Sequence, residues 1–411
     1  MVIKESPRLI GVDIFRGALI WMLLFLHNLS SYRGDLDSLG GNMSNPIVSS
    51  IGKFLGLWGS FFFIITGFAN TISLYRKYEN PEVNSRKIIF KNLIKVLILI
   101  GFDRISGILI GRESRGGGIY NFNEGPIYYS IFLGWLKTGM IHTPQLFFIL
   151  YFQTAVTTLA YVLLILTFTE VILFKKRPKN HRYRNMFILT SISIFIFIIS
   201  PFVIQLLRPM WVDALINNNI GRILIFGVLV GDTQSLLPYL GFGFVGAVFG
   251  LAYEMRIPRK PVVIIGSIFS LTSGLIGIIG YIILGEPPYE FIIQTLPGRA
   301  MWLLIAIMVI PILLIYYFEF VPKSPLKLHR LSLNIQRFGK VSLSLYVIEG
   351  VVGESLILLI SLIFPDWASK MQFLAPFGII LIIIWGYLLR WWERVNYVGS
   401  AEWMIQKAIQ F

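Results

Sequence analysis

Ten long apolar stretches dominate this sequence, and each has at least the roughly 20 residues that a helix needs to cross the hydrocarbon core of a bilayer. They cover residues 9–29, 54–75, 88–110, 144–174, 186–206, 235–254, 261–284, 299–319, 341–364 and 374–392. Backbone groups in hydrocarbon must bond within their own segment, so we expect each stretch to be a helix. With 55% hydrophobic residues, a soluble domain of 411 residues would expose large apolar patches. The sequence therefore predicts an all-α, polytopic integral membrane bundle of about ten transmembrane helices, forming a single domain over residues 1–411.

The chain is strongly basic, with a formal net charge of +15. Its Lys and Arg residues cluster between alternate apolar stretches, as at 175–179 and 256–260. Because cytoplasmic loops of membrane proteins carry such an excess of positive charge, we expect a multi-pass protein of the cell membrane with both termini in the cytoplasm. The basic character then reflects topology, and we expect no nucleic-acid partner.

The chain contains no cysteine, which excludes disulfides, thiolate nucleophiles and cysteine-based metal sites. Its four histidines are scattered and lack the close spacing typical of a metal site, so we expect no metal. A removable signal peptide is not expected either, because Asp13 and Arg16 interrupt the first apolar stretch.

The first apolar stretch carries Asp13, Arg16, His27 and Asn28. At about 100° per residue, the eleven steps from Arg16 to His27 bring both side chains to nearly the same helix face, with Asp13 one turn before Arg16. Ionisable groups are costly in lipid, so this polar face is expected to line a buried cavity. His27 is the best candidate for a general base, since a free imidazole has a pKa of roughly 6.5. Two structural readings stay open: His27 bonding a neighbouring carbonyl, and Asp13 pairing with Arg16 within the helix.

Other polar residues in or near the apolar stretches are weaker candidates. Asp232 and Glu349 rank highest among them, because a carboxylate can orient an imidazole or an acceptor amine. His142 lies on the same predicted outer side as His27 and is a less certain partner of a substrate. Each of these residues is also compatible with a plain interhelical hydrogen bond.

Two loops and one small-residue motif complete this reading. The outer segment 111–143 is too short in apolar length to cross and is expected to form a re-entrant or interfacial flap. The basic inner connection 320–340 is expected to be a solvated loop facing anionic headgroups. Gly246-x-x-x-Gly250 predicts close helix packing.

Four motifs, in order along the chain, resemble those of the transmembrane acyltransferase superfamily, which includes acyltransferase-3, heparan-alpha-glucosaminide N-acetyltransferase and YeiB-like membrane proteins. Residues 13–17, Asp-Ile-Phe-Arg-Gly, followed by His27 resemble the family's first helix. Residues 59–68 resemble its Phe-Phe-x-x-Ser-Gly-Phe segment. Residues 338–346 resemble its Gly-x-x-Ser-x-x-Tyr helix start, and 397–403 resemble its Tyr-Gly-Pro-x-Glu-Trp ending.

The resemblance implies an enzyme that takes an acyl group, first of all acetyl, from cytosolic acyl-CoA and passes it to a hydroxyl or amine of an outward-facing saccharide. His27 would be catalytic, and Arg16 would help to bind the donor. Asp13, Asn28, Asp232, Tyr346 and Glu349 complete the expected supporting or donor-binding set. Glu349 stands three residues after the tyrosine, where acyltransferase-3 members usually have histidine.

Acyl-CoA would act as a co-substrate, and no permanently bound cofactor is expected. Besides acyl-CoA and the acceptor, the expected partner is membrane lipid, and small-residue faces could serve a homo-oligomer. A different class of function also fits the first helix: a transporter or channel in which Asp13, Arg16 and His27 form a polar path.

Overall fold

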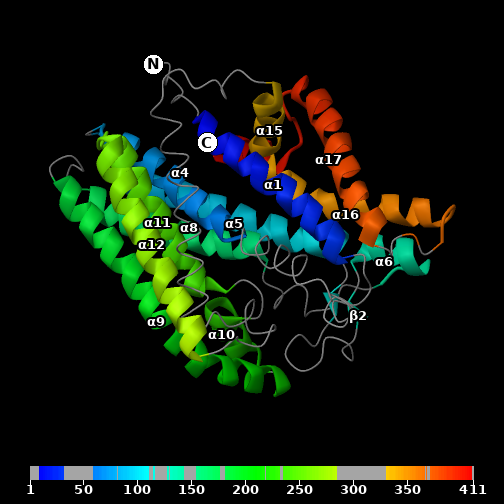
Figure 1. The fold of residues 1–411 in the computed structure, drawn as a ribbon, viewed down its shortest axis with the longest axis horizontal. Helices are drawn as coiled ribbons and strands as arrows, with labels where there is room; N and C mark the ends of the chain where they lie inside the picture. The colour runs from blue at the N-terminus through cyan, green and yellow to red at the C-terminus, as the bar shows by residue number, and fades with distance from the viewer. Residues whose placement is uncertain are drawn as a thin grey trace.

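The described part of the chain folds almost entirely into helices, as a computed structural model shows (Figure 1). The structure describes residues 9–31, 59–80, 82–110, 114–115, 127–128, 130–142, 154–175, 181–217, 219–231, 235–284, 330–365, 367 and 371–409. The helices are α1 (Ile10–Ser31), α4 (Ser60–Tyr78), α5 (Ser85–Ile110), α6 (Ile131–Thr138), α8 (Ala155–Phe174), α9 (Arg182–Ile216), α10 (Ile220–Val230), α11 (Leu236–Glu254), α12 (Arg259–Leu284), α15 (Arg330–Lys340), α16 (Ser342–Ser361), α17 (Met371–Glu393) and α18 (Ala401–Ile409). Strands β1 (Ser114–Arg115) and β2 (Ile127–Tyr128) form a short antiparallel pair.

Helices occupy the described parts of nine of the ten apolar stretches, whereas residues 54–58, 144–153 and the whole of 299–319 lie outside the described residues. Within the described part of the chain, five helical segments are long and apolar enough to cross a membrane. They are Ala155–Phe174, Tyr183–Ile216, Leu236–Glu254, Ser342–Ser361 and Pro376–Glu393. The all-α architecture is therefore confirmed, and the five candidate helices suggest a membrane protein, whereas ten crossings, the single domain and the orientation of the termini stay predictions.

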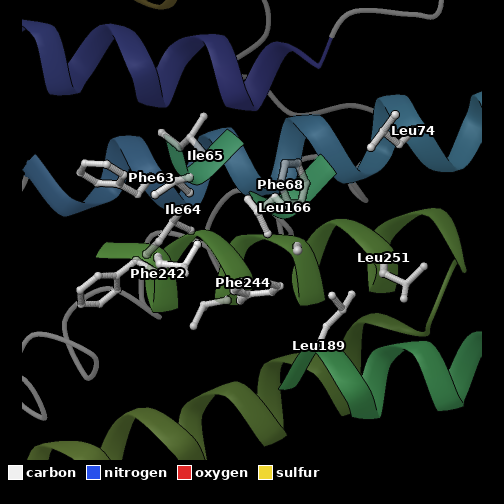
Figure 2. Packing of buried hydrophobic residues seen from close by; sticks show 14 of the residues in the cluster. Phe63, Ile64, Ile65, Phe68, Leu74, Leu166, Leu189, Phe242, Phe244 and Leu251 are labelled. Carbon is white, nitrogen blue, oxygen red and sulfur yellow. The ribbon is translucent and has the colours of Figure 1, made fainter. Parts of the chain in front are cut away.

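The first group of helices, α4, α8, α9 and α11, surrounds the largest apolar core (Figure 2). Backbone contacts between α4 and α11 are possible because glycines face each other. A Cβ atom added at Gly246 would lie 2.0 Å from the carbonyl oxygen of Ile64, and one at Gly250 would lie 2.7 Å from that of Phe68. The packing predicted for Gly246-x-x-x-Gly250 is confirmed, and its partner is α4.

The second group consists of α1, α15, α16 and α17, which share a separate apolar core. Glycines again bring two helices into backbone contact, here α1 and α15. A Cβ atom at Gly17 would lie 1.8 Å from the carbonyl oxygen of Ile335, and one at Gly339 would lie 2.0 Å from that of Asp13. The Trp21 and Phe338 rings extend this contact with an edge-to-face arrangement at 5.5 Å.

The expectation of a solvated loop over 320–340 is wrong for its C-terminal half, because residues 330–340 form α15. This segment is polar on one face and apolar on the other, and its apolar face packs on α1. Glu393 of α17 fixes its far end by accepting hydrogen bonds from Arg337 Nε at 2.7 Å and Lys340 Nζ at 3.0 Å. The basic residues of this segment are therefore as compatible with a surface helix as with a loop.

Helix α9 is longer than the predicted stretch 186–206 and continues to Ile216. The extension contains Pro209, which removes one backbone donor but leaves the helix unbroken. Trp211 on this extension packs with Val230 of α10, a helix that the sequence reading did not anticipate. The α9 extension contains Arg208 and Asp213, so it does not continue the uninterrupted apolar stretch, and α10, with 11 residues, is too short to be predicted as a membrane crossing.

Candidate active site

His27 and Glu349, separated by 322 positions in the sequence, meet where α1 crosses α16. His27 Nδ1 lies 2.6 Å from Glu349 Oε1, a short distance typical of a charge-assisted hydrogen bond. The Glu349 side chain is only 2% exposed, whereas that of His27 is 34% exposed. A buried carboxylate thus faces one ring nitrogen of a histidine that solvent or a ligand can reach.

This geometry has a defined chemical consequence. A carboxylate that accepts from Nδ1–H fixes the ring orientation and the tautomer, so that Nε2 is the nitrogen that takes up a proton. The Tyr346 ring lies one turn before Glu349 on α16, with its centroid 6.4 Å from that of His27. The structure therefore brings three of the predicted site residues together: His27, Glu349 and Tyr346.

Helix α16 is held in register by a carboxylate from the C-terminal helix α18. Glu402 Oε1 accepts from the backbone N–H of Leu343 at 2.6 Å, and its Oε2 accepts from Ser344 Oγ at 2.6 Å. Ser344 Oγ in turn accepts from the backbone N–H of Ala401 at 2.8 Å. The first backbone N–H groups of a helix lack partners within the helix, so an anion at this end satisfies them and interacts well with the helix dipole. Glu402, which the sequence reading placed only in a motif, thus positions the helix that carries Glu349.

Arg16 lies half-buried on α1 beside Gly17, in the region where α1 touches α15. It belongs to a group of cations that also includes Lys95 of α5 and Lys77 of α4. Electrostatic repulsion links Lys95 to both Arg16 and Lys77. Burial and the nearby Lys91 lower the pKa of Lys77, the expected result of holding like charges together. Cations from three helices therefore lie close enough to repel one another, an arrangement that favours an anion.

The remaining predicted site residues have no described contact with His27 or Glu349. Asp13 is 5% exposed, and its backbone carbonyl is the group that contacts α15. His142 follows α6, where its Nε2 lies 2.8 Å from Thr138 Oγ1. Asn28 lies in α1, but its side chain is outside the described part of the structure, and Asp232 lies outside the described residues altogether.

A second polar cluster, which the sequence reading missed, lies between α4 and α8. Glu170 is fully buried and accepts hydrogen bonds from Asn70 Nδ2 at 2.7 Å and from Thr71 Oγ1. Thr71 Oγ1 also lies 2.9 Å from the carbonyl oxygen of Gly67. The sequence feature that could have indicated this cluster is Glu170 itself, a glutamate near the end of the apolar stretch 144–174. The pattern is that of interhelical hydrogen bonding.

The described residues include no group of three or more His, Asp or Glu side chains that could hold a metal ion. No protein-family model matches the chain, and no curated protein matches it. The membership suggested by the four motifs therefore stays a prediction, and the geometry around His27 is the observation that bears on function.

Proposed function

We propose that this chain is an integral membrane acyltransferase. It would move an acyl group, first of all acetyl, from cytosolic acyl-CoA to a hydroxyl or amine of an outward-facing saccharide. The observation that carries the proposal is the hydrogen bond between His27, a partly exposed imidazole, and Glu349, a buried carboxylate. Imidazole oriented by a carboxylate is a recurrent arrangement for taking a proton from an attacking nucleophile.

The proposed reaction transfers one proton and one acyl group. Nε2 of His27 takes the proton from the acceptor hydroxyl or amine while the acceptor atom attacks the thioester carbonyl. The carbon–sulfur bond then breaks, and the imidazolium returns its proton to the departing thiolate. The products are the acylated acceptor and free CoA. General-base assistance of this kind contributes on the order of 10²- to 10⁴-fold in rate. An acyl-imidazole intermediate would use the same nitrogen and would be recognised by burst kinetics.

The cations around Arg16 support a donor that carries phosphates. Eleven residues of helix separate Arg16 from His27, which corresponds to about 16 Å along the axis of α1. A compact ligand cannot span that distance, but one with a long arm can. With the N-terminus in the cytoplasm, Arg16, Lys77 and Lys95 would face the inner side, and His27 would face outward. Acyl-CoA, with phosphates at one end and a thioester at the other, matches both the charge and the separation.

The test is hydrolysis or transfer of labelled acetyl-CoA by the purified protein in detergent or nanodiscs. His27→Ala should abolish turnover, and Glu349→Gln should lower kcat by 10²-fold or more, while both variants keep their thermal stabilisation by CoA. His181→Ala is the matched histidine control, because His181 lies at the start of α9 and is exposed. Asp103→Asn is the matched control for a buried carboxylate, since the Asp103 oxygens accept hydrogen bonds from Thr154 and Thr157 and not from a histidine in the contacts described.

The transporter reading makes the opposite prediction. If CoA neither stabilises the protein nor reacts, and the protein moves a solute into liposomes, the acyltransferase proposal is wrong. If CoA reacts equally well with His27→Ala, another residue performs the chemistry.

A further inference from the structure

Helix α6 is too short to cross a membrane, and it lies against the C-terminal part of α5 and against α16 (Figure 1). Leu133 and Gly134 form its buried inner face. In the proposed orientation, this is the outward end of the molecule, the same end as His27 on α1. In that orientation, α6 therefore lies at the level of the outer membrane boundary.

An ion pair attaches the inner face of α6 to α16. Lys137 Nζ lies 2.9 Å from Glu354 Oε2, with side-chain exposures of 24% and 3%. Glu354 lies five residues beyond Glu349 on the same helix. Partly buried pairs are screened by solvent much less than surface pairs, so this contact can fix the position of α6.

The opposite side of α6 and the residues that follow it are exposed and apolar. Phe132, Trp135, Met140 and Ile141 are each exposed by more than a third of their surface. Ile105 of α5 is also exposed, and α5 contacts α6. Leu362 and Ile363, which directly follow α16, are exposed as well, and α16 likewise contacts α6.

We infer that α6 is an interfacial helix whose Phe132 and Trp135 face binds the phospholipids of the outer leaflet while Lys137 holds its inner face on α16. Phospholipid is the occupant that the surface favours, because the apolar face belongs to a helix that packs on α5 and α16, which also expose apolar residues, and because it is rich in aromatic side chains. Tryptophan and phenylalanine of this kind gather at the boundary between headgroups and acyl chains. The inference depends on the membrane orientation given with the proposed function, and it does not depend on acyl transfer.

The absence of cysteine makes a direct test possible, because any introduced cysteine is unique. Nitroxide labels at Trp135→Cys and Met140→Cys, in full-length protein reconstituted into phosphatidylcholine and phosphatidylglycerol vesicles, would report accessibility to oxygen and to a water-soluble nickel complex. Ile105→Cys serves as the lipid-facing control and Glu82→Cys, on an exposed turn, as the water-facing control. For the labels at positions 135 and 140, the ratio of oxygen accessibility to nickel accessibility should be at least severalfold higher than for Glu82→Cys. The same ratio should place both labels at a shallower membrane depth than the label at Ile105→Cys. Labels that resemble Glu82→Cys would overturn the inference, whereas a water-like Ile105→Cys label would instead refute the proposed membrane placement.

The ion pair is tested in the Met140→Cys background. Glu354→Gln should increase the mobility of the label at position 140, two residues after α6. Glu254→Gln, which breaks the pair with Arg76 between α4 and α11, should not change it. If Glu354→Gln does not fold, Lys137→Gln removes the same pair from its more exposed side. Unchanged label mobility in a folded variant would show that Lys137 does not hold α6 on α16.

Discussion

Replacing Gly339 by alanine should separate α1 from α15. The added Cβ would lie 2.0 Å from the carbonyl oxygen, 2.8 Å from the carbonyl carbon and 3.1 Å from the Cα of Asp13. Carbon and oxygen atoms that are not bonded need more than about 3 Å, so α1 or α15 must shift by roughly 1 Å or more. The clashing atoms belong to the backbone, and no side-chain rotation can relieve them.

The cost of this shift can be estimated. Overpacking a well-packed contact destabilises by about 1–3 kcal/mol, and the Gly339 contact should lie near the upper end because both helices are held elsewhere. Alanine regains up to about 1 kcal/mol of helix propensity relative to glycine. We therefore expect a net loss of about 1–2 kcal/mol, together with lower activity, since Arg16 lies one turn from Asp13 on α1.

Thermal unfolding in detergent, followed by intrinsic fluorescence of the ten tryptophans, measures this effect. Gly386→Ala is the matched control, because Gly386 lies in α17 and a Cβ there meets nothing within 4 Å. The control should unfold at the same temperature as the unmodified protein or slightly higher. Equal midpoints for Gly339→Ala and Gly386→Ala would refute the backbone contact between α1 and α15.

Two further substitutions test the polar contacts that hold the bundle. Glu402→Ala should destabilise by about 1–2 kcal/mol, because Ser344 and the first turn of α16 lose their acceptor; Glu402→Gln, which retains an acceptor oxygen, should lose less in the same thermal assay. Thr71→Val should cost about 1–3 kcal/mol, because buried Glu170 loses one of its two donors. Thr169→Val is its control, since in the contacts of the described residues Thr169 Oγ1 donates only to the carbonyl oxygen of Ile165, one turn before it. A loss for Thr169→Val as large as that for Thr71→Val would contradict the assigned role of the cluster.

Much of the fold could be predicted from sequence because bilayer length and apolar composition dictate helices. The ends of the helices and the amphipathic segments could not. Residues 330–340 were read as a loop because their charges suggest solvent, yet their apolar face has α1 as a partner. Whether such a face finds a partner is a tertiary property, and no local pattern contains it.

The candidate site divides in the same way. His27 and Glu349 could be predicted from the sequence, because ionisable groups within apolar stretches are energetically costly and therefore indicate a functional role. The cation group around Arg16 could not be assembled, since Lys77 and Lys95 belong to helices whose rotation about their axes is set by packing. The hydrogen bonds from Leu343 and Ser344 to Glu402 could not be predicted either, because a motif identifies residues and not their contacts.

Helix α1 connects both ends of the proposed reaction, with Gly17 and Arg16 at one level and His27 at the other. A displacement forced at Gly339 should therefore reach the hydrogen bond between His27 and Glu349. If it does, Gly339→Ala and Glu349→Gln impair the same contact, and their effects on kcat/KM should not add in a double-mutant cycle. Residues that share a network show interaction energies of about 0.5–3 kcal/mol, whereas independent sites add to within about 0.5 kcal/mol. In the contacts described, α15 does not touch His27, so a displacement at Gly339 can reach His27 only through α1. If the effects of Gly339→Ala and Glu349→Gln on kcat/KM are strictly additive, α1 bends and does not move as a rigid helix. The Arg16 end and the His27 end of α1 would then be positioned independently.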